Sequence, residues 1–228
     1  MKKIALATAF VATIVMTAVA APGGQTPAAT QKVDQAPPDG GLVMLHAEGK
    51  LAVVNACAYE GVAISNTVKK IGNVFMILVE EQKAGAWSLS ESKSAFDATT
   101  ANAAVFVVKD KSLPISLVAI ESRWGVVNAE GMSDAVLGKE IMRVTTLLLG
   151  GASSKYSASV MRPAFSIEDI EKVGDLATID SLMAIFPNLK AYGFKQYEMM
   201  TFREAYESGH TPPPQNDEQK KIAAEFKK

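Results

Sequence analysis

The stretch KLAVVNACAYEGVAISNTVKKIGNVFMILVE, residues 50–80, decides the fold class of this chain. Its two ends, Lys50–Cys57 and Asn73–Glu80, are short apolar runs typical of buried strands. Between them, Glu60–Ile71 places apolar side chains at helical spacing, and Gly72 is a suitable helix stop. A strand, a helix and a strand in this order form a right-handed βαβ unit with parallel strands. The sequence therefore predicts an α/β fold.

Three further strands are expected downstream, at Ala103–Asp110, Pro114–Glu121 and Trp124–Glu130. They are rich in β-branched residues and are joined by brief turns, so they can add antiparallel partners at one edge of the sheet. The expected architecture is a mixed sheet of four to five strands that begins with the βαβ unit.

A long helix is expected after the last strand. Ser133 is a good N-cap residue, and Asp134 lies in the first turn. The expected helix has one apolar face, formed by Leu137, Ile141, Val144 and Leu148. The pair Gly150–Gly151 is expected to end the helix with a left-handed cap. Two short helices, within 166–174 and 179–189, complete a helical C-terminal part.

The two ends of the chain differ in composition from its middle. Residues 1–20 have the basic start, apolar run and small-residue cleavage site of a signal peptide. We therefore expect an exported protein, periplasmic or secreted, with no membrane span after cleavage. Residues 21–41 are typical of a disordered linker. Residues 42–209 are long enough for a single α/β domain, and 210–228 form a Pro-rich and charged tail.

Composition argues against several partners and sites. Of 23 Lys and Arg, the signal peptide holds Lys2 and Lys3, and the rest form no basic patch with interleaved aromatic residues, which argues against nucleic acid as a partner. The two histidines, His46 and His210, cannot form an HExxH pair, so no metal cofactor is expected. Cys57 is the only cysteine, which excludes an internal disulfide and favours a small buried side chain at this position.

No catalytic constellation is recognisable, so the chain is more consistent with a non-enzyme than with an enzyme. Ser90–Lys93 matches SxxK, but the companion motifs of that family are absent. No nucleophile elbow, phosphate loop or dinucleotide fingerprint occurs. Lys139, Glu140 and Arg143 are expected to form a solvated helix face on which the last two pair.

The spacing in GKEIMRVTTLLLGGASSKYSASVM, residues 138–161, resembles the archaemetzincins, zinc peptidase-like proteins of the metzincin group. Their active helix and following loop read HExxHxxGxxHC, then four residues, then CxM. Gly150 matches the glycine that bends the chain, and Met161 lies at the matching distance. The resemblance places the three histidine positions on Arg143, Leu147 and Ser153, the glutamate on Val144, the two cysteines on Ser154 and Ser159, and the methionine on Met161.

The resemblance implies a metzincin-like fold over residues 50–189 in which the ligand positions lack their ligands. Without the three histidines and the glutamate, the zinc, the activated water and the general base are lost together. The resemblance therefore implies that zinc-dependent hydrolysis cannot occur. The name relic positions is used below for the seven residues that the resemblance matches: Arg143, Val144, Leu147, Ser153, Ser154, Ser159 and Met161.

Three functions stay open at this point. The first is an exported, non-catalytic pseudo-peptidase domain, with a peptide or an envelope protein as its candidate partner along the former substrate cleft. The second is a hydrolase of another, metal-independent class that uses a Ser, Lys or carboxylate site near 153–159. The third is a structural or assembly module. The sequence decides neither the partner nor the oligomeric state.

Overall fold

The computed structural model describes residues 38–45, 47–84, 91, 94, 96, 100–209 and 212–226. The expected signal peptide, most of the expected linker and both histidines lie outside the described residues, and so does the SxxK match apart from Glu91. In the part of the chain that is described, no helix is both long enough and apolar enough to cross a membrane.

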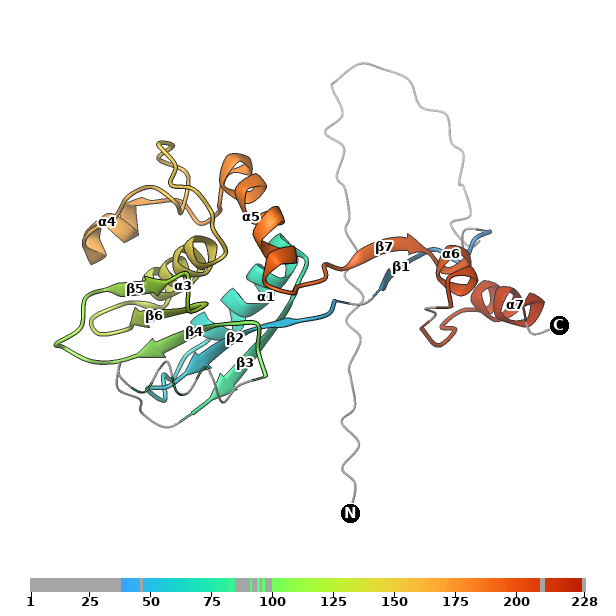
Figure 1. Ribbon diagram of the computed structural model, residues 1–228, viewed down its shortest axis with the longest axis horizontal. Coiled ribbons are helices and arrows are strands. Elements are labelled where there is room, and N and C mark those ends of the chain that lie inside the picture. The colour runs from blue at the N-terminus through green and yellow to red at the C-terminus, as the bar shows by residue number, and fades with distance from the viewer. Residues whose placement is uncertain are drawn as a thin grey trace, which may run out of the picture. The chain divides into compact units, whose positions relative to one another are not determined.

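A five-stranded mixed sheet forms the centre of the fold (Figure 1). Its strands, in spatial order, are β3 (Leu78–Lys83), β2 (Lys50–Asn55), β4 (Ala103–Val108), β6 (Trp124–Asn128) and β5 (Ser116–Ala119). The four strands from β3 to β6 are parallel to one another, whereas β5 is antiparallel to β6. The predicted α/β fold with a mixed sheet and a βαβ start is confirmed.

Helices cover one face of this sheet. A second, smaller sheet is formed by an early strand and a late strand of the described chain. The remaining elements are β1 (Leu42–Leu45), α1 (Ala63–Phe75), α3 (Asp134–Leu148), α4 (Ile167–Lys172), α5 (Ile179–Ala191), β7 (Glu198–Thr201), α6 (Phe202–Glu207) and α7 (Asp217–Glu225). Helices α1 and α3 pack on the same face of the five-stranded sheet (Figure 1). Strands β1 and β7 pair with each other in antiparallel orientation.

The central strands bury side chains on both faces of the sheet. In β2, Leu51 and Val53 face the cluster that includes α1 and α3, whereas Ala52 and Val54 belong to a separate cluster with Phe106. This alternation follows from the two-residue period of a strand. Burial on both faces also explains why these strands read as continuous apolar runs in the sequence.

The second strand of the βαβ unit begins later than the sequence predicted. Helix α1 does not stop at Gly72 but continues to Phe75, whose side chain is buried in the main core. Phe75 follows Ile71 by four residues and so extends the apolar face of the helix. The left-handed residue that ends the helix is Met76, with a φ of 55°. Most of the predicted strand at 73–80 is therefore helix and turn.

Of the last three strands of this sheet, only β5 is antiparallel to its neighbour. We expected brief turns to place antiparallel partners side by side, and this holds for the hairpin between β5 and β6. Strand β4 instead pairs with β6 in parallel. The connection at 109–115 is long enough to carry the chain past the place of β6 to the edge of the sheet, so β6 fits between the two strands that precede it.

Both ends of α3 have the predicted caps. The Ser133 hydroxyl accepts a hydrogen bond from the Val136 amide. At the other end, Gly150 N donates to Leu147 O at 2.9 Å and Gly151 N donates to Thr146 O at 2.7 Å. These two bonds, with a φ of 85° at Gly150, form a Schellman motif. The helix therefore ends where the glycine pair predicts, and the chain turns into the loop that carries the other relic positions.

Parts of the expected linker and tail belong to folded structure. Helix α7 lies within 210–228, and its Ile222 is fully buried. Gln219 Nε2 donates to the Gly40 carbonyl at 2.9 Å. Tyr206 of α6 stacks on Phe226, with ring centroids 5.3 Å apart. The domain boundaries at 20, 41 and 209 stay predictions.

The glycine that ends α3 should be the least replaceable of the left-handed glycines near this helix. A Cβ at Gly150 would lie 1.9 Å from Asn188 Nδ2, which donates to Leu149 O and Ala184 O. Gly131, with a φ of 74°, offers a matched control, because a Cβ there meets only Ile167 Cδ1 at 3.5 Å.

Gly131→Ala should cost about 1–2 kcal/mol for the left-handed conformation alone. Gly150→Ala should cost about 1–3 kcal/mol more, since Asn188 must leave its two carbonyl partners. Chemical denaturation of the two variants measures both costs. Equal losses of stability would show that the contact with Asn188 does not matter.

Candidate functional site

The seven relic positions lie on α3 and on the loop that follows it. Arg143, Val144 and Leu147 are on α3, and Ser153, Ser154, Ser159 and Met161 are in the loop. The loop closes on itself, because Ser154 N donates to Met161 O at 3.0 Å. Val160 N also donates to Leu176 O at 2.9 Å, which attaches the loop to the segment before α5.

Three of the relic positions belong to the hydrophobic core. Val144 and Met161 are buried in the main cluster, and Leu147 packs against it. Val144 occupies the position where the resemblance places the glutamate, and its Cγ1 would lie 2.6 Å from a Cβ at Gly125 on β6. Val144 therefore packs directly against the backbone of β6. The three residues therefore stabilise the fold through apolar burial.

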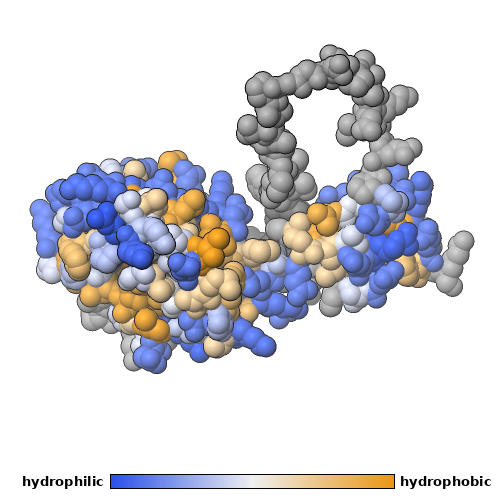
Figure 2. Space-filling view, turned by 90° about the horizontal axis from the view of Figure 1, so that it is seen from above, coloured by the Kyte–Doolittle hydropathy of each residue, from blue (hydrophilic) through white to orange (hydrophobic). Residues whose placement is uncertain are grey.

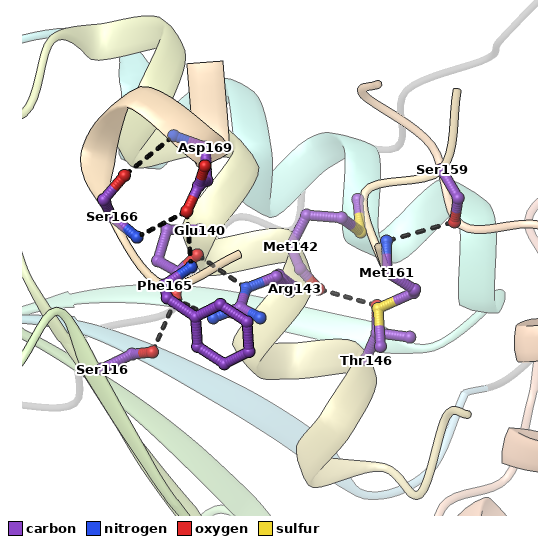
Figure 3. A network of polar contacts seen from close by, with 10 residues as sticks. All are labelled: Ser116, Glu140, Met142, Arg143, Thr146, Ser159, Met161, Phe165, Ser166 and Asp169. Carbon is purple, nitrogen blue, oxygen red and sulfur yellow. Dashed lines mark hydrogen bonds and ion pairs between the residues drawn. The ribbon is translucent and has the colours of Figure 1, made fainter. Parts of the chain in front are cut away.

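The serines of the loop form turns. Ser154 Oγ accepts from Tyr156 N at 3.3 Å, and Ser159 Oγ accepts from Met161 N at 3.1 Å (Figure 3). Each hydroxyl thus bonds the amide two residues later, which is a common turn arrangement. Ser153 is exposed. Among the described residues, no lysine or carboxylate bonds any of these hydroxyls.

A pocket of about 380 Å³ lies beside this loop, lined by Ser153, Ser154, Lys155, Tyr156 and Asp180. Each of its lining residues carries a polar group, whereas sites for small molecules are mostly apolar with a few placed polar groups. The pocket brings a cation and a carboxylate near the serines without a bond between them. It does not supply the hydroxyl–base pair that a hydrolase site here would need.

The sequence predicted that Arg143 lies on a solvated helix face. The structure instead places it in a partly buried network. Its Nε donates to Glu140 Oε2 at 2.9 Å, and its Nη2 donates to Oε1 at 3.1 Å. The Ser116 hydroxyl of β5 donates to the same Oε1 at 2.6 Å (Figure 3). The Glu140 side chain is 0% exposed and that of Arg143 is 15% exposed. The expectation of a solvated pair is wrong, because α3 packs against β5 at this point.

Lys139, the third member of the expected solvated face, is also engaged. Its ammonium donates to Glu171 O at 2.8 Å and Val173 O at 2.7 Å, and it lies 3.8 Å from Asp175 Oδ1. These carbonyls belong to the C-terminal end of α4, where a cation is favourable. Lys139 therefore fastens α4 to α3.

The residues at the relic positions do not fit a zinc ion. A guanidinium has no lone pair to offer, valine and leucine have no donor atom, and a serine hydroxyl is not one of the usual zinc ligands. In the described ranges, no group of three or more His, Cys, Asp and Glu side chains could hold a metal ion. Burial raises the pKa of the Cys57 thiol, so less of it is the thiolate that binds metals or attacks electrophiles.

Removing one member of the Glu140–Arg143 pair should destabilise the fold more than removing both. Arg143→Met leaves a buried carboxylate without its cation, which should cost about 3–5 kcal/mol, whereas the Glu140→Met/Arg143→Met double variant should recover most of this loss. Thermal and urea unfolding measure the difference. Lys220 and Asp217 on α7 offer a control pair with the same spacing and exposed side chains, and Lys220→Met should change stability little. A double variant less stable than Arg143→Met would contradict this account.

Comparisons with known proteins give a likeness in structure alone. No family model matches the chain, and no curated protein matches it. The archaemetzincin of Methanopyrus kandleri superimposes with a TM-score of 0.51 at 12% identity, over 62% of this chain and 96% of that one.

Two further solved structures are similar over a comparable length. They are a zinc-dependent peptidase from Methanocorpusculum labreanum, with a TM-score of 0.47 at 9% identity, and the archaemetzincin of Archaeoglobus fulgidus complexed with malonate, with 0.48 at 12%. They cover 60% of this chain, and 100% and 99% of their own chains. The likeness to the Methanopyrus kandleri structure shows that the fold described here is archaemetzincin-like, as the spacing in 138–161 predicted.

Proposed function

We propose that this chain is an exported, non-catalytic pseudo-peptidase domain that binds an extended peptide segment along the former substrate cleft. The observation that supports it best is the state of the relic positions within an archaemetzincin-like fold. Arg143 is paired with a buried carboxylate, and Val144 and Leu147 are part of the core. None of these groups can activate a water molecule or hold the metal that would do so.

The edge strand β5 supports the binding part of the proposal. In the described sheet, β5 pairs with β6 on one side and with no strand on the other. An open edge can accept an extended peptide as a further strand through main-chain hydrogen bonds. Ser116 ties this strand to α3 through Glu140, so a peptide on β5 would run beside the relic positions of the helix.

An exposed aromatic ring near α3 supports the same reading. Phe165 is 86% exposed, while its neighbour Ala164 packs on Val136 of α3, one turn before Glu140. The Phe165 amide donates to Asp169 Oδ2 at 3.1 Å, so the backbone at this position is held by the start of α4 (Figure 3). A large apolar side chain on a fixed backbone, open to solvent, suits contact with a partner.

Metal content and peptidase activity test the proposal. The purified protein beginning at Ala21 should contain no stoichiometric zinc and should show no chelator-sensitive cleavage in a broad peptide screen. Leu147→His should gain neither property, since one imidazole cannot form a three-ligand site. A known zinc peptidase run in parallel provides the positive control. Stoichiometric zinc in the wild-type protein, or cleavage that a chelator stops, would overturn the proposal.

One observation favours assembly as a second candidate function. Helix α5 exposes Ile179, Met183 and Phe186, which follow one another at helical spacing on one face. Figure 2 shows groups of apolar side chains among hydrophilic ones on the face that it draws. For assembly, this face of α5 would pack against the same face of a second copy of the chain. A self-complementary patch of this kind gives a symmetric dimer.

The solution mass separates the two candidates. If α5 is an interface, the protein should be a dimer, and Met183→Glu should convert it to a monomer, whereas the exposed Lys190→Glu on the same helix should not. Sedimentation or light scattering measures the mass. A wild-type protein that stays monomeric at high concentration would exclude the assembly function and leave the peptide-binding proposal intact.

A further inference from the structure

We propose that Arg143 is a carboxylate-binding residue, which would take the C-terminal carboxylate or an acidic side chain of the peptide on β5. The inference rests on the proposed function, because it names the chemistry of the partner at the same cleft. It concerns the N–H donors of the guanidinium that do not bond Glu140.

Within the described residues, two of the five N–H donors of Arg143 have partners. Nε and Nη2 each donate once to the two oxygens of Glu140, which is the side-on form of the arginine–carboxylate pair. Both hydrogens of Nη1 and the second hydrogen of Nη2 have no acceptor among the described residues. Nη1 and Nη2 together form the end-on fork of the guanidinium, whose shape matches a second carboxylate.

The free donors are within reach of solvent. In the described part of the chain, the buried side-chain nitrogen and oxygen atoms without a partner are Trp124 Nε1 and Thr145 Oγ1. Nη1 of Arg143 also has no partner among the described residues but is not one of these buried atoms, so it has accessible surface. Nη1 is therefore not enclosed by the protein, and a ligand can approach the fork from the side of Nη1.

The guanidinium is fixed before a ligand arrives. Glu140 is fully buried and is held in turn by the Ser116 hydroxyl, so the Arg143 side chain has little rotational freedom left to lose. Fixing a binding group in advance lowers the entropic cost of association. Lys139 provides a contrast, because its ammonium already has two carbonyls and the Asp175 carboxylate as neighbours.

The charge of the network favours a monoanion. Glu140 neutralises most of the positive charge of Arg143, so the pair does not offer the clustered cations that a phosphate or another dianion attracts. What it offers is a planar fork of correct width beside an open strand edge. A carboxylate of a peptide whose main chain pairs with β5 has both the charge and the shape that this fork accepts.

Three pools of short labelled peptides test the inference on the mature protein. One pool has a free C-terminal carboxylate and no Asp or Glu, the second has internal Asp and Glu with an amidated C-terminus, and the third has neither. Wild-type protein should retain one of the first two pools about tenfold better than the third, as a charge-assisted bidentate contact implies. The pool that is retained identifies the source of the carboxylate.

Variants assign the preference to Arg143. Arg143→Lys keeps the charge without the fork, and Glu140→Met/Arg143→Met removes the fork without leaving a buried charge, so at least one of them should fold. Both should lose the preference for carboxylates while still retaining the third pool at the wild-type level. Lys139→Met should keep the preference. Equal retention of all three pools by the wild type would overturn the inference alone, whereas retention of none would overturn the peptide-binding function with it.

Discussion

Helix α3 has to pack against the sheet with an apolar face while it carries a carboxylate into the same interior. The hydrophobic part of this constraint is met by Leu137, Ile141, Val144 and Leu148, which are all fully buried. The polar part is met locally, because Glu140 receives Arg143 from its own helix and Ser116 from β5. A buried ion pair gains little net stability, but each partner is costly to lose alone. The position of β5 relative to α3 is therefore set by a polar contact as well as by packing.

Much of the fold could be predicted from local patterns because these patterns reflect local physics. The start of α3 at Ser133 and its end at Gly150 depend on side chains and dihedral angles within a few residues. The predicted start of β3 was wrong because Phe75 fits both a strand pattern and a helix pattern. Only the buried face of α1 decides between the two. The parallel pairing of β4 with β6 depends on which strand fills the sheet, which neighbouring residues do not encode.

That the seven relic positions mark a former site stays a prediction. The structure shows that they lie on α3 and its loop, with Val144 and Met161 together in the core. The network of Arg143 was missed, since the partner on β5 is 24 residues from Glu140 in sequence and no pattern links them. Three charged residues within 139–143 resemble an exposed helix surface until the neighbouring strand is known. The buried face of α3 is wider than its four apolar positions and includes Glu140, and this width is known only from the structure.

The turns at Ser154 and Ser159 have a consequence for how the protein reaches its native state. Where a loop is shaped by coordination to an ion, folding waits for the ion and fails when it is scarce. In this chain each hydroxyl bonds an amide two residues away, and the loop ends are joined by the bond from Ser154 N to Met161 O. All the information needed to shape this loop is thus present once the chain has been made. Folding of this loop therefore does not wait for a metal ion.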